Sequence, residues 1–208
     1  MNTVVTLIAA DPIVETCVDA VCSALGGEPV WLAEGIACDI ASNLPPDAAE
    51  FAARKIAGAA ALDIAAQPVA GRRKRLLVAD MESTIIENEM LDELADELGL
   101  RAEIATITAR AMRGELDFEG AIRERVAMLA DLEEEALLRS EAKIRIMPGA
   151  PELVATMKAY GAACALVSGG FEFYTRRIRE RLGFDTDQAN RLEIRDGRLT
   201  GSVIPPIL

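Results

Sequence analysis

The sequence contains no histidine, and this absence removes several kinds of catalytic site from consideration. Serine–histidine–aspartate and cysteine–histidine nucleophiles need an imidazole as the general base. Zinc sites of the His-Glu-x-x-His type and histidine-based phosphoryl transfer need the same side chain. Chemistry within these 208 residues must therefore use carboxylates, hydroxyls, lysine, arginine and a hard cation, which oxygen ligands bind.

Cysteine spacing, positive charge and long apolar runs are also missing. Cys17, Cys22, Cys38 and Cys164 show no Cys-x-x-Cys spacing, so we expect small core residues in a reducing cytoplasm. A net charge of −12 argues against nucleic acid and anionic membrane surfaces as partners. No apolar run approaches the roughly 18 residues of a membrane span, and the N-terminus lacks the basic region of a signal peptide.

Aromatic residues make up only 4% of a chain that is 51% hydrophobic, which favours α/β or helical packing over a β-sandwich. Residues 1–70 read as strand, helix, one or two strands, helix and strand, an order typical of a small α+β unit. We expect these elements at residues 4–9, 13–25, 29–41, 48–56 and 62–69. The basic run 71–75 is expected to be a solvated linker, and a second domain starts at Leu76.

The apolar run 76–79 predicts a strand that ends in Asp80, followed by Glu82, Ser83 and Thr84. Open α/β sheets place their chemistry at the carboxyl ends of strands. Asp80 can serve there as a nucleophile on phosphorus, with Glu82 as general acid and then base. Thr84 can hydrogen-bond the transferred group.

Residues 87–145 have helical periodicity and predict about four helices between the first strand and the next. A helix is expected over 151–160, a strand over 162–167, a helix over 174–182 and a hairpin over 192–203 with Asp196-Gly197 as its turn. The small residues Ser168-Gly169-Gly170 follow a strand and precede a helix, an arrangement that lets backbone N–H groups approach an anion.

The run Asp80–Thr84, its continuation IIENEMLDELADELG to Gly99, and ALVSGGF at 165–171 resemble the haloacid dehalogenase-like phosphatases, and among them the phosphoserine phosphatases. The resemblance implies an α/β fold, with a Rossmann-like parallel sheet core over 76–208 and an inserted helical cap at about 87–146. It also implies that residues 1–70 are a small ACT-like α+β domain. The implied activity is Mg²⁺-dependent hydrolysis of O-phospho-L-serine to L-serine, the last step of serine biosynthesis, with a possible homodimer.

The resemblance also assigns roles to individual residues. Asp80 and Glu82 are the catalytic residues, and Mg²⁺ is held by the Asp80 side chain and the Glu82 carbonyl. Glu89 and Arg125 are expected to read the ammonium and the carboxylate or phosphate of the substrate. Ser168 and Gly169 bind the phosphoryl oxygens. Met112 and Phe118 line the substrate or, as the alternative, belong to an ordinary cap core.

Two departures from the family pattern limit these expectations. The family has Asp where this chain has Glu82, and a displacement of about 1 Å can slow a reaction on the order of 100-fold. The family's later lysine and acidic motif are absent, and Lys158 precedes the second motif, so it cannot replace that lysine. We therefore expect a truncated chain that is inactive by itself. A catalytically impaired phosphoserine or serine sensor, and a phosphatase for another small phosphomonoester, remain alternatives.

Overall fold

The computed structural model describes all residues 1–208 and divides into two compact units, Met1–Lys74 and Arg75–Leu208. The elements of the first unit, in chain order, are β1 (Thr3–Ile8), α1 (Glu15–Leu25), β2 (Pro29–Ala33), β3 (Ala37–Ser42), α2 (Pro46–Ala57) and β4 (Asp63–Pro68). All the elements expected in residues 1–70 are present, with bounds that differ by a few residues, and the segment 29–41 is a pair of strands.

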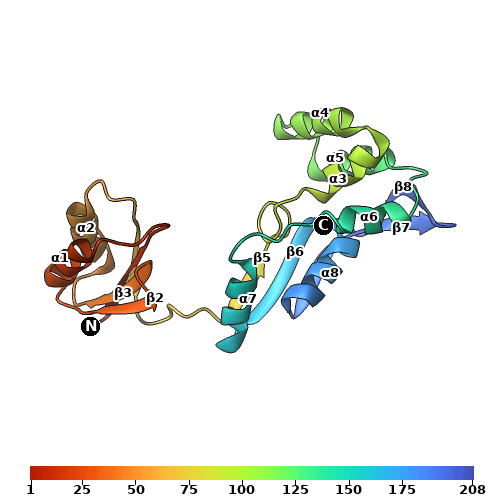
Figure 1. The fold of residues 1–208 in the computed structure, drawn as a ribbon. Coiled ribbons are helices and arrows are strands. Elements are labelled where there is room, and N and C mark those ends of the chain that lie inside the picture. The colour runs from red at the N-terminus through yellow and green to blue at the C-terminus, as the bar shows by residue number, and fades with distance from the viewer. The chain divides into compact units, whose positions relative to one another are not determined.

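The first unit is an antiparallel sheet in the order β2-β3-β1-β4 with α1 and α2 packed on one face (Figure 1). Alternate residues of the central strands, Val5 and Leu7 on β1 and Cys38 and Ile40 on β3, are buried in the core beneath the helices. This period of two is what a sheet with one covered face requires. The βαββαβ order is that of the ferredoxin-like fold.

One residue of the basic segment 71–75, Arg72, is held by hydrogen bonds to the sheet of the first unit. Arg72 donates from Nη1 to Asp39 Oδ2 at 2.5 Å and from Nη2 to Asp39 Oδ1 at 2.7 Å, and Nη2 also reaches Thr6 Oγ1 at 3.1 Å. A two-pronged guanidinium–carboxylate pair fixes both geometry and charge. The expectation of a solvated linker is therefore wrong for Arg72, because β3 supplies a carboxylate 33 residues away in sequence.

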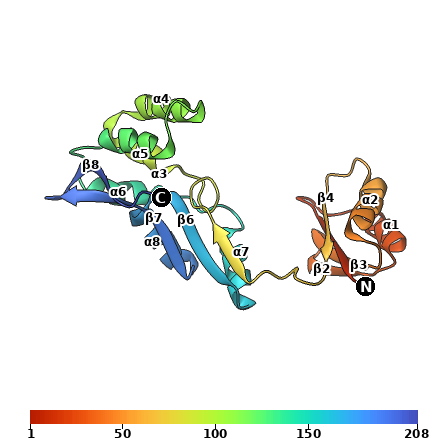
Figure 2. The same cartoon turned by 180° about the vertical axis from the view of Figure 1, so that it is seen from behind.

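The second unit contains a mixed sheet in the order β5-β6-β7-β8. Its strands are β5 (Leu76–Ala79), β6 (Ala163–Phe171), β7 (Thr186–Arg195) and β8 (Arg198–Ile204), and helices α7 (Ala150–Ala159) and α8 (Glu172–Leu182) join them. The pairs β5–β6 and β6–β7 are parallel, as expected for a Rossmann-like core, whereas β8 runs antiparallel to β7. Both helices cover the same face of the sheet (Figures 1 and 2), and Leu76 and Val78 on edge strand β5 are each 59% exposed.

The turn between β7 and β8 has the predicted sequence and geometry. Asp196 has φ 51° and Gly197 has φ 73°, and a two-residue hairpin turn of type I′ needs positive φ at both central residues. The hairpin is longer than expected at its start, because β7 begins at Thr186 and first pairs in parallel with β6. The strand expected over 162–167 also continues to Phe171, so the Ser168–Gly170 stretch belongs to β6 and not to a following loop.

Four helices follow β5, as predicted: α3 (Met90–Leu98), α4 (Arg101–Met112), α5 (Phe118–Ala127) and α6 (Glu135–Glu141). Helices α3, α4 and α5 lie together beyond one end of the sheet, and α6 lies beside β7 and α8 (Figure 1). The two chain segments that join this insertion to the sheet pair with each other, through Glu87 N–H to Arg145 O and Met147 N–H to Ile85 O, both at 2.9 Å. No helix of the chain is both long and apolar enough to cross a membrane.

Candidate active site

The segment after β5 is a tight turn organised by one carbonyl. Met81 is fully buried, and its carbonyl oxygen accepts hydrogen bonds from the N–H groups of Ile85 at 2.8 Å and Ile86 at 2.9 Å. Ser83 adopts φ 53° within this turn, which is uncommon for a residue with a side chain. The turn leaves Asp80 exposed at the tip of β5, where Thr84 Oγ1 donates to Asp80 Oδ2 at 3.3 Å.

Glu82 is on the same turn, but its side chain points into the protein, whereas that of Asp80 is exposed. Its Oε1 accepts a hydrogen bond from the Met90 N–H at 2.7 Å, at the first turn of α3. Burial raises the pKa of Glu82 to about 7, and the nearby carboxylates of Glu89 and Asp80 act in the same direction. The Met90 N–H and the positive charge of Arg125 oppose that rise. A carboxyl group with this pKa can exchange a proton near neutral pH, which a general acid–base requires.

Gly170 provides the space that Glu82 occupies. A Cβ atom at Gly170 would lie 2.7 Å from Glu82 Oε2, closer than non-bonded atoms approach, and 3.1 Å from Ser168 Oγ, which is a tight contact. Ser168 is only 3% exposed, and its Oγ accepts from the Gly170 N–H at 2.9 Å. The end of β6 therefore packs directly on the acid at position 82.

Asn190 and Phe118 hold the Ser168–Gly170 stretch in place. Asn190 was not predicted as a site residue, and Phe118 was not expected to contact β6. The fully buried Asn190 on β7 donates from Nδ2 to Gly169 O at 2.8 Å. Phe118 at the start of α5 lies against Gly169, where an added Cβ would be 3.0 Å from the ring. Phe118 was expected as a substrate wall or cap core; the ring is 50% exposed, so the cap-core alternative is wrong. No local signal marks Asn190, because its partner is 21 residues away.

A cavity of about 170 Å³ brings together four of the six predicted site residues: Glu82, Glu89, Arg125 and Gly169. Apolar side chains complete its wall, among them Phe118 and Phe171. Asp80 and Ser168 do not line it: Asp80 is exposed on the turn, and Ser168 is buried behind Gly170.

The two charged residues from the cap have defined partners in this cavity. Glu89 Oε1 accepts a hydrogen bond from Ser83 Oγ at 2.7 Å, and Arg125 Nε donates to the Ala121 carbonyl at 3.2 Å. Burial lowers the pKa of Arg125, while the charges of Glu82, Asp92 and Glu89 oppose that change. The remaining guanidinium nitrogens of Arg125 make no ion pair within 4.0 Å, so they are available to an anion.

Two other candidate residues lie outside this cavity. Met112 is 86% exposed and lines a neighbouring cavity of about 270 Å³ that shares Phe118 and Arg125, so the cap-core alternative is wrong for Met112 as well. Lys158 pairs with Asp185, whose Oδ2 accepts from the Cys164 N–H at 2.8 Å. Cys164 lies near the amino end of β6, so Lys158 is at the opposite end of the sheet from Ser168.

The site offers oxygen ligands for a hard cation, but it has no cluster of several metal-binding side chains. No group of three or more histidine, cysteine, aspartate and glutamate side chains converges in a way that could hold a metal ion. Asp80 has a carboxylate with only one hydrogen-bond donor, from Thr84, and the Glu82 carbonyl accepts no backbone hydrogen bond. Mg²⁺ commonly takes one or two protein oxygens and fills its octahedron with water and substrate phosphate.

Comparison with known proteins agrees with this geometry. A family model described as haloacid dehalogenase-like hydrolase matches residues 77–207. The chain belongs to the haloacid dehalogenase-like hydrolase family. The match begins within β5 and includes the Asp80 turn, the helical insertion and the glycine stretch of β6.

Named relatives within this family are phosphoserine phosphatases. The phosphoserine phosphatase of Archaeoglobus fulgidus is 48% identical over 144 residues, which are 68% of this chain and 42% of that protein. A solved phospho-aspartyl intermediate analogue of phosphoserine phosphatase has 42% identity and a TM-score of 0.59, and the match covers 64% of this chain and 63% of that one. The unliganded crystal structure of a probable phosphoserine phosphatase from Vibrio cholerae has 30% identity and a TM-score of 0.74, covering 100% of this chain and 64% of that one. The chain thus spans less than half the length of the first of these relatives.

Proposed function

We propose that this hydrolase domain removes the phosphate from O-phospho-L-serine through a covalent aspartyl-phosphate at Asp80. The observation that carries the proposal is the cavity in which Glu82, Glu89 and Arg125 meet Gly169 beside the carboxyl ends of β5 and β6. Two carboxylates, one unpaired guanidinium and a glycine backbone match a small substrate that carries an ammonium, a carboxylate and a phosphate. The named phosphoserine phosphatase relatives support the same substrate.

The proposed reaction has two steps that use the same two side chains. A carboxylate oxygen of Asp80 attacks phosphorus, the bond from phosphorus to the serine oxygen breaks, and protonated Glu82 gives its proton to that oxygen. The Glu82 carboxylate then takes a proton from a water molecule that attacks the aspartyl-phosphate. Inorganic phosphate leaves, and both Asp80 and Glu82 return to their starting states. A pKa of about 7 lets Glu82 play both parts near neutral pH.

Substrate recognition follows from the charges that line the cavity. The Glu89 carboxylate, held by Ser83, would pair with the substrate ammonium, and Arg125 would take the carboxylate or phosphate with its free nitrogens. The Gly169 N–H and the Ser168 hydroxyl would bind phosphoryl oxygens. Ser168 Oγ accepts from Gly170, so its own proton remains to be donated.

Mg²⁺ is part of the proposal because the oxygen donors fit it. The Asp80 carboxylate and the Glu82 carbonyl would hold the ion, with phosphate and water completing the shell. When bound, it offsets negative charge between nucleophile and phosphate. Because the chain has a net charge of −12, the positive charge of a bound cation would be needed to bring a dianionic phosphate to Asp80.

The first unit is proposed to be ACT-like and regulatory, supported by its βαββαβ order and its antiparallel sheet with two helices on one face. A homodimer and a cytoplasmic location are proposed with it. Titration with L-serine, followed by the fluorescence of Trp31 on β2, tests the regulatory role, and an unchanged spectrum at saturating serine would contradict it.

The decisive experiment measures phosphate release from O-phospho-L-serine with Mg²⁺ and with EDTA, alongside substrate binding by calorimetry. We expect Mg²⁺-dependent release from a protein that also carries the family's later lysine and acidic motif, and none from the 208-residue chain alone. In the longer protein, Asp80→Asn should abolish release, and the matched change Asp96→Asn, at the Arg101 ion pair of α3, should leave it intact. Phosphothreonine and phosphoethanolamine should react more slowly. Binding without release would favour a phosphoserine sensor, and the absence of both would contradict the proposal.

A further inference from the structure

The two central strands of the second unit lose their regular pairing at the glycine stretch. β6 and β7 pair in parallel up to Val167 and Gln188, and the next pair after these is Phe171 with Asn190. Between the two pairs β6 advances four residues and β7 only two, so the stretch 168–170 cannot be matched by the ladder. Buried backbone groups are almost always paired, so the polar groups of this stretch need partners other than the neighbouring strand.

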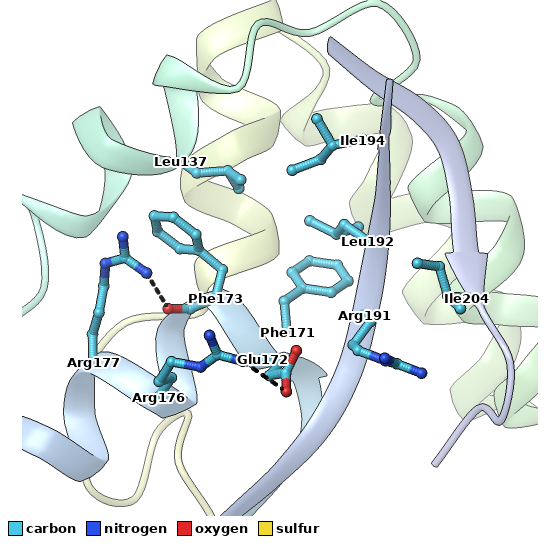
Figure 3. Close-up of a pocket in the computed structure, with 10 residues that line it drawn as sticks. All are labelled: Leu137, Phe171, Glu172, Phe173, Arg176, Arg177, Arg191, Leu192, Ile194 and Ile204. Carbon is cyan, nitrogen blue, oxygen red and sulfur yellow. Dashed lines mark hydrogen bonds and ion pairs between the residues drawn. The ribbon is translucent and has the colours of Figure 1, made fainter. Parts of the chain in front are cut away.

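The side chain of Asn190 takes the place of a missing ladder partner. It is fully buried, and its Nδ2 donates to Gly169 O at 2.8 Å. Figure 3 shows Leu192 pointing toward Phe171, while Arg191 points away from them on the other face of β7. Side chains alternate along a strand, so Asn190 lies on the same inner face as Leu192 and not on the face of Arg191.

The two hydrogen bonds of the Asn190 amide determine which way the amide faces. Nδ2 donates to Gly169 O, and Oδ1 accepts from the Leu208 N–H at 2.8 Å. Turning the amide over would place its NH₂ group against an N–H donor and its oxygen against a carbonyl, so both contacts would be lost. An apolar side chain of similar size could fill this place, but it could hold neither backbone group.

The peptide between Gly169 and Gly170 is held at both of its polar groups. Asn190 binds its carbonyl oxygen, and Ser168 Oγ accepts from its N–H at 2.9 Å. Glycine has no Cβ to restrict its backbone, so a peptide between two glycines can turn over at little steric cost. A turned peptide would release the Gly169 oxygen from β7, and its partial negative charge would oppose an anion in the cavity that both glycines line.

We propose that Asn190 is a positioning residue for the phosphoryl group: its amide holds the Gly169–Gly170 peptide in the orientation that lets the Gly169 N–H bind a phosphoryl oxygen. The inference rests on the proposed function, which assigns the phosphoryl oxygens to Ser168 and Gly169. Asn190 does not line the cavity, so it acts through Gly169. A hydrogen-bond donor contributes most when it is already aimed at the charge that it binds, so losing this orientation weakens phosphate binding and slows phosphoryl transfer.

The first test measures the orientation of this peptide in the ligand-free 208-residue protein, from residual dipolar couplings of the backbone N–H groups. Asn190→Leu removes both hydrogen bonds, so the couplings of Gly169 and Gly170 should change. Thr175→Val is the matched control, because Thr175 is also fully buried and donates at 2.7 Å to Asp187 on the same strand, not to the glycine stretch. Couplings at both glycines that stay unchanged in Asn190→Leu would overturn the inference.

The second test uses Asn190→Asp, which keeps the shape of the side chain. A protonated carboxyl group can donate to Gly169 O, whereas an ionised one places a negative oxygen against it. Inorganic phosphate is titrated with Mg²⁺ present, and the amide signals of Gly169 and Gly170 are followed by NMR. Affinity relative to wild type should fall about tenfold at pH 8 and recover as pH falls to 5, whereas Thr175→Val should match wild type at both.

Three results of this titration would overturn the inference. A loss of affinity that is the same at every pH would mean that the substitution acts through packing alone. Wild-type affinity in both Asn190→Leu and Asn190→Asp would mean that Asn190 is not needed. The absence of any phosphate-dependent shift at the two glycines in wild type would remove the assignment of Gly169 to the phosphoryl group, and this inference with it.

Kinetics separate a failure of this inference from a failure of the proposed function. In a protein that also carries the family's later lysine and acidic motif, Asn190→Asp should lower kcat/KM for O-phospho-L-serine about 10- to 100-fold at pH 8, and less at pH 5, relative to wild type. Wild-type rates in both Asn190 variants would overturn the positioning role and leave the proposed function standing. Phosphate binding that depends on Asn190, in a longer protein that does not hydrolyse phosphoserine, would overturn the proposed function and support the role of Asn190 in phosphate binding.

Discussion

The buried carboxyl group of Glu82 should make the stability of the second unit depend on pH in an unusual direction. Most carboxylates with a folded-state partner stabilise a protein as pH rises, because their pKa is lowered on folding. Glu82 does the reverse, since burial raises its pKa from 4.5 to about 7. The folded state therefore holds this proton more tightly than the unfolded state, and stability falls as pH rises between those two values.

The magnitude follows from the two pKa values. A shift of this size corresponds to about 3 kcal/mol of destabilisation at a pH above both values. Between pH 5 and pH 8 the linkage relation gives a change of about 2–3 kcal/mol, because part of the effect is already present at pH 5. Glu82→Gln cannot ionise, and its side-chain oxygen can still accept the hydrogen bond from Met90. The stability of this variant relative to wild type should therefore rise by about 2–3 kcal/mol over that pH range.

The assay is urea unfolding at several pH values in EDTA, which removes divalent ions that would stabilise the carboxylate. Far-UV circular dichroism follows both units, while the only tryptophan, Trp31, reports the first unit and serves as an internal control. Glu97→Gln is a matched control with the opposite sign, because hydrogen bonds from Arg139 and Lys143 lower the pKa of Glu97. Its loss of stability relative to wild type should be largest at pH 8 and shrink as pH falls through the folded-state pKa.

Two results would refute this reasoning. A difference between Glu82→Gln and wild type that is the same at pH 5 and pH 8 would mean that Glu82 is ionised in the folded protein throughout. A change in the Trp31 transition of the same size would mean that the substitution does not act through its own unit. Either result would also remove the argument that Glu82 can exchange a proton near neutral pH.

Gly170→Ala should lower the free energy of unfolding of the second unit by about 1–3 kcal/mol, because the new Cβ would lie 2.7 Å from Glu82 Oε2. Gly169→Ala meets only a half-exposed aromatic ring and should cost less, so equal losses in urea unfolding would contradict the close packing at Gly170. Ser83→Ala removes the 2.7 Å hydrogen bond to Glu89 and should weaken phosphoserine binding about tenfold, measured by calorimetry. Affinity equal to wild type would show that Glu89 does not need this support.

The elements that could be predicted from the sequence are those specified by neighbouring residues. The strand before Asp80 and the hairpin at Asp196-Gly197 are confirmed because apolar runs and turn residues act over a few positions. The four helices between β5 and α7 follow from periodicity in the same way. The family motifs also assigned Glu82 and Gly169 to one site, although they are 87 positions apart, and both residues line the same cavity.

The features that could not be predicted depend on partners distant in sequence. Arg72 is fixed by Asp39, and Asn190 holds Gly169, neither of which leaves a local pattern. The continuation of β6 to Phe171 depends on pairing with β7, whose register shifts between Val167 and Phe171. Periodicity also cannot tell an apolar residue in a core from one beside an open cavity, which is why Met112 could be assigned to a core although it is exposed.

The substitution of Glu for the family's Asp at position 82 is accommodated by the surrounding structure. One carboxylate oxygen is fixed by the first turn of α3, and the other lies where only a glycine at 170 leaves room. The extra methylene therefore does not push the carboxyl group out of the site, and it places the group in the cavity with Glu89 and Arg125. If this placement serves proton transfer, Glu82→Asp should lose the Met90 hydrogen bond and slow the proposed hydrolysis of phosphoserine. A faster rate in Glu82→Asp would mean that the extra methylene displaces the carboxyl group from its position for proton transfer, and an unchanged rate would mean that this position does not limit the reaction.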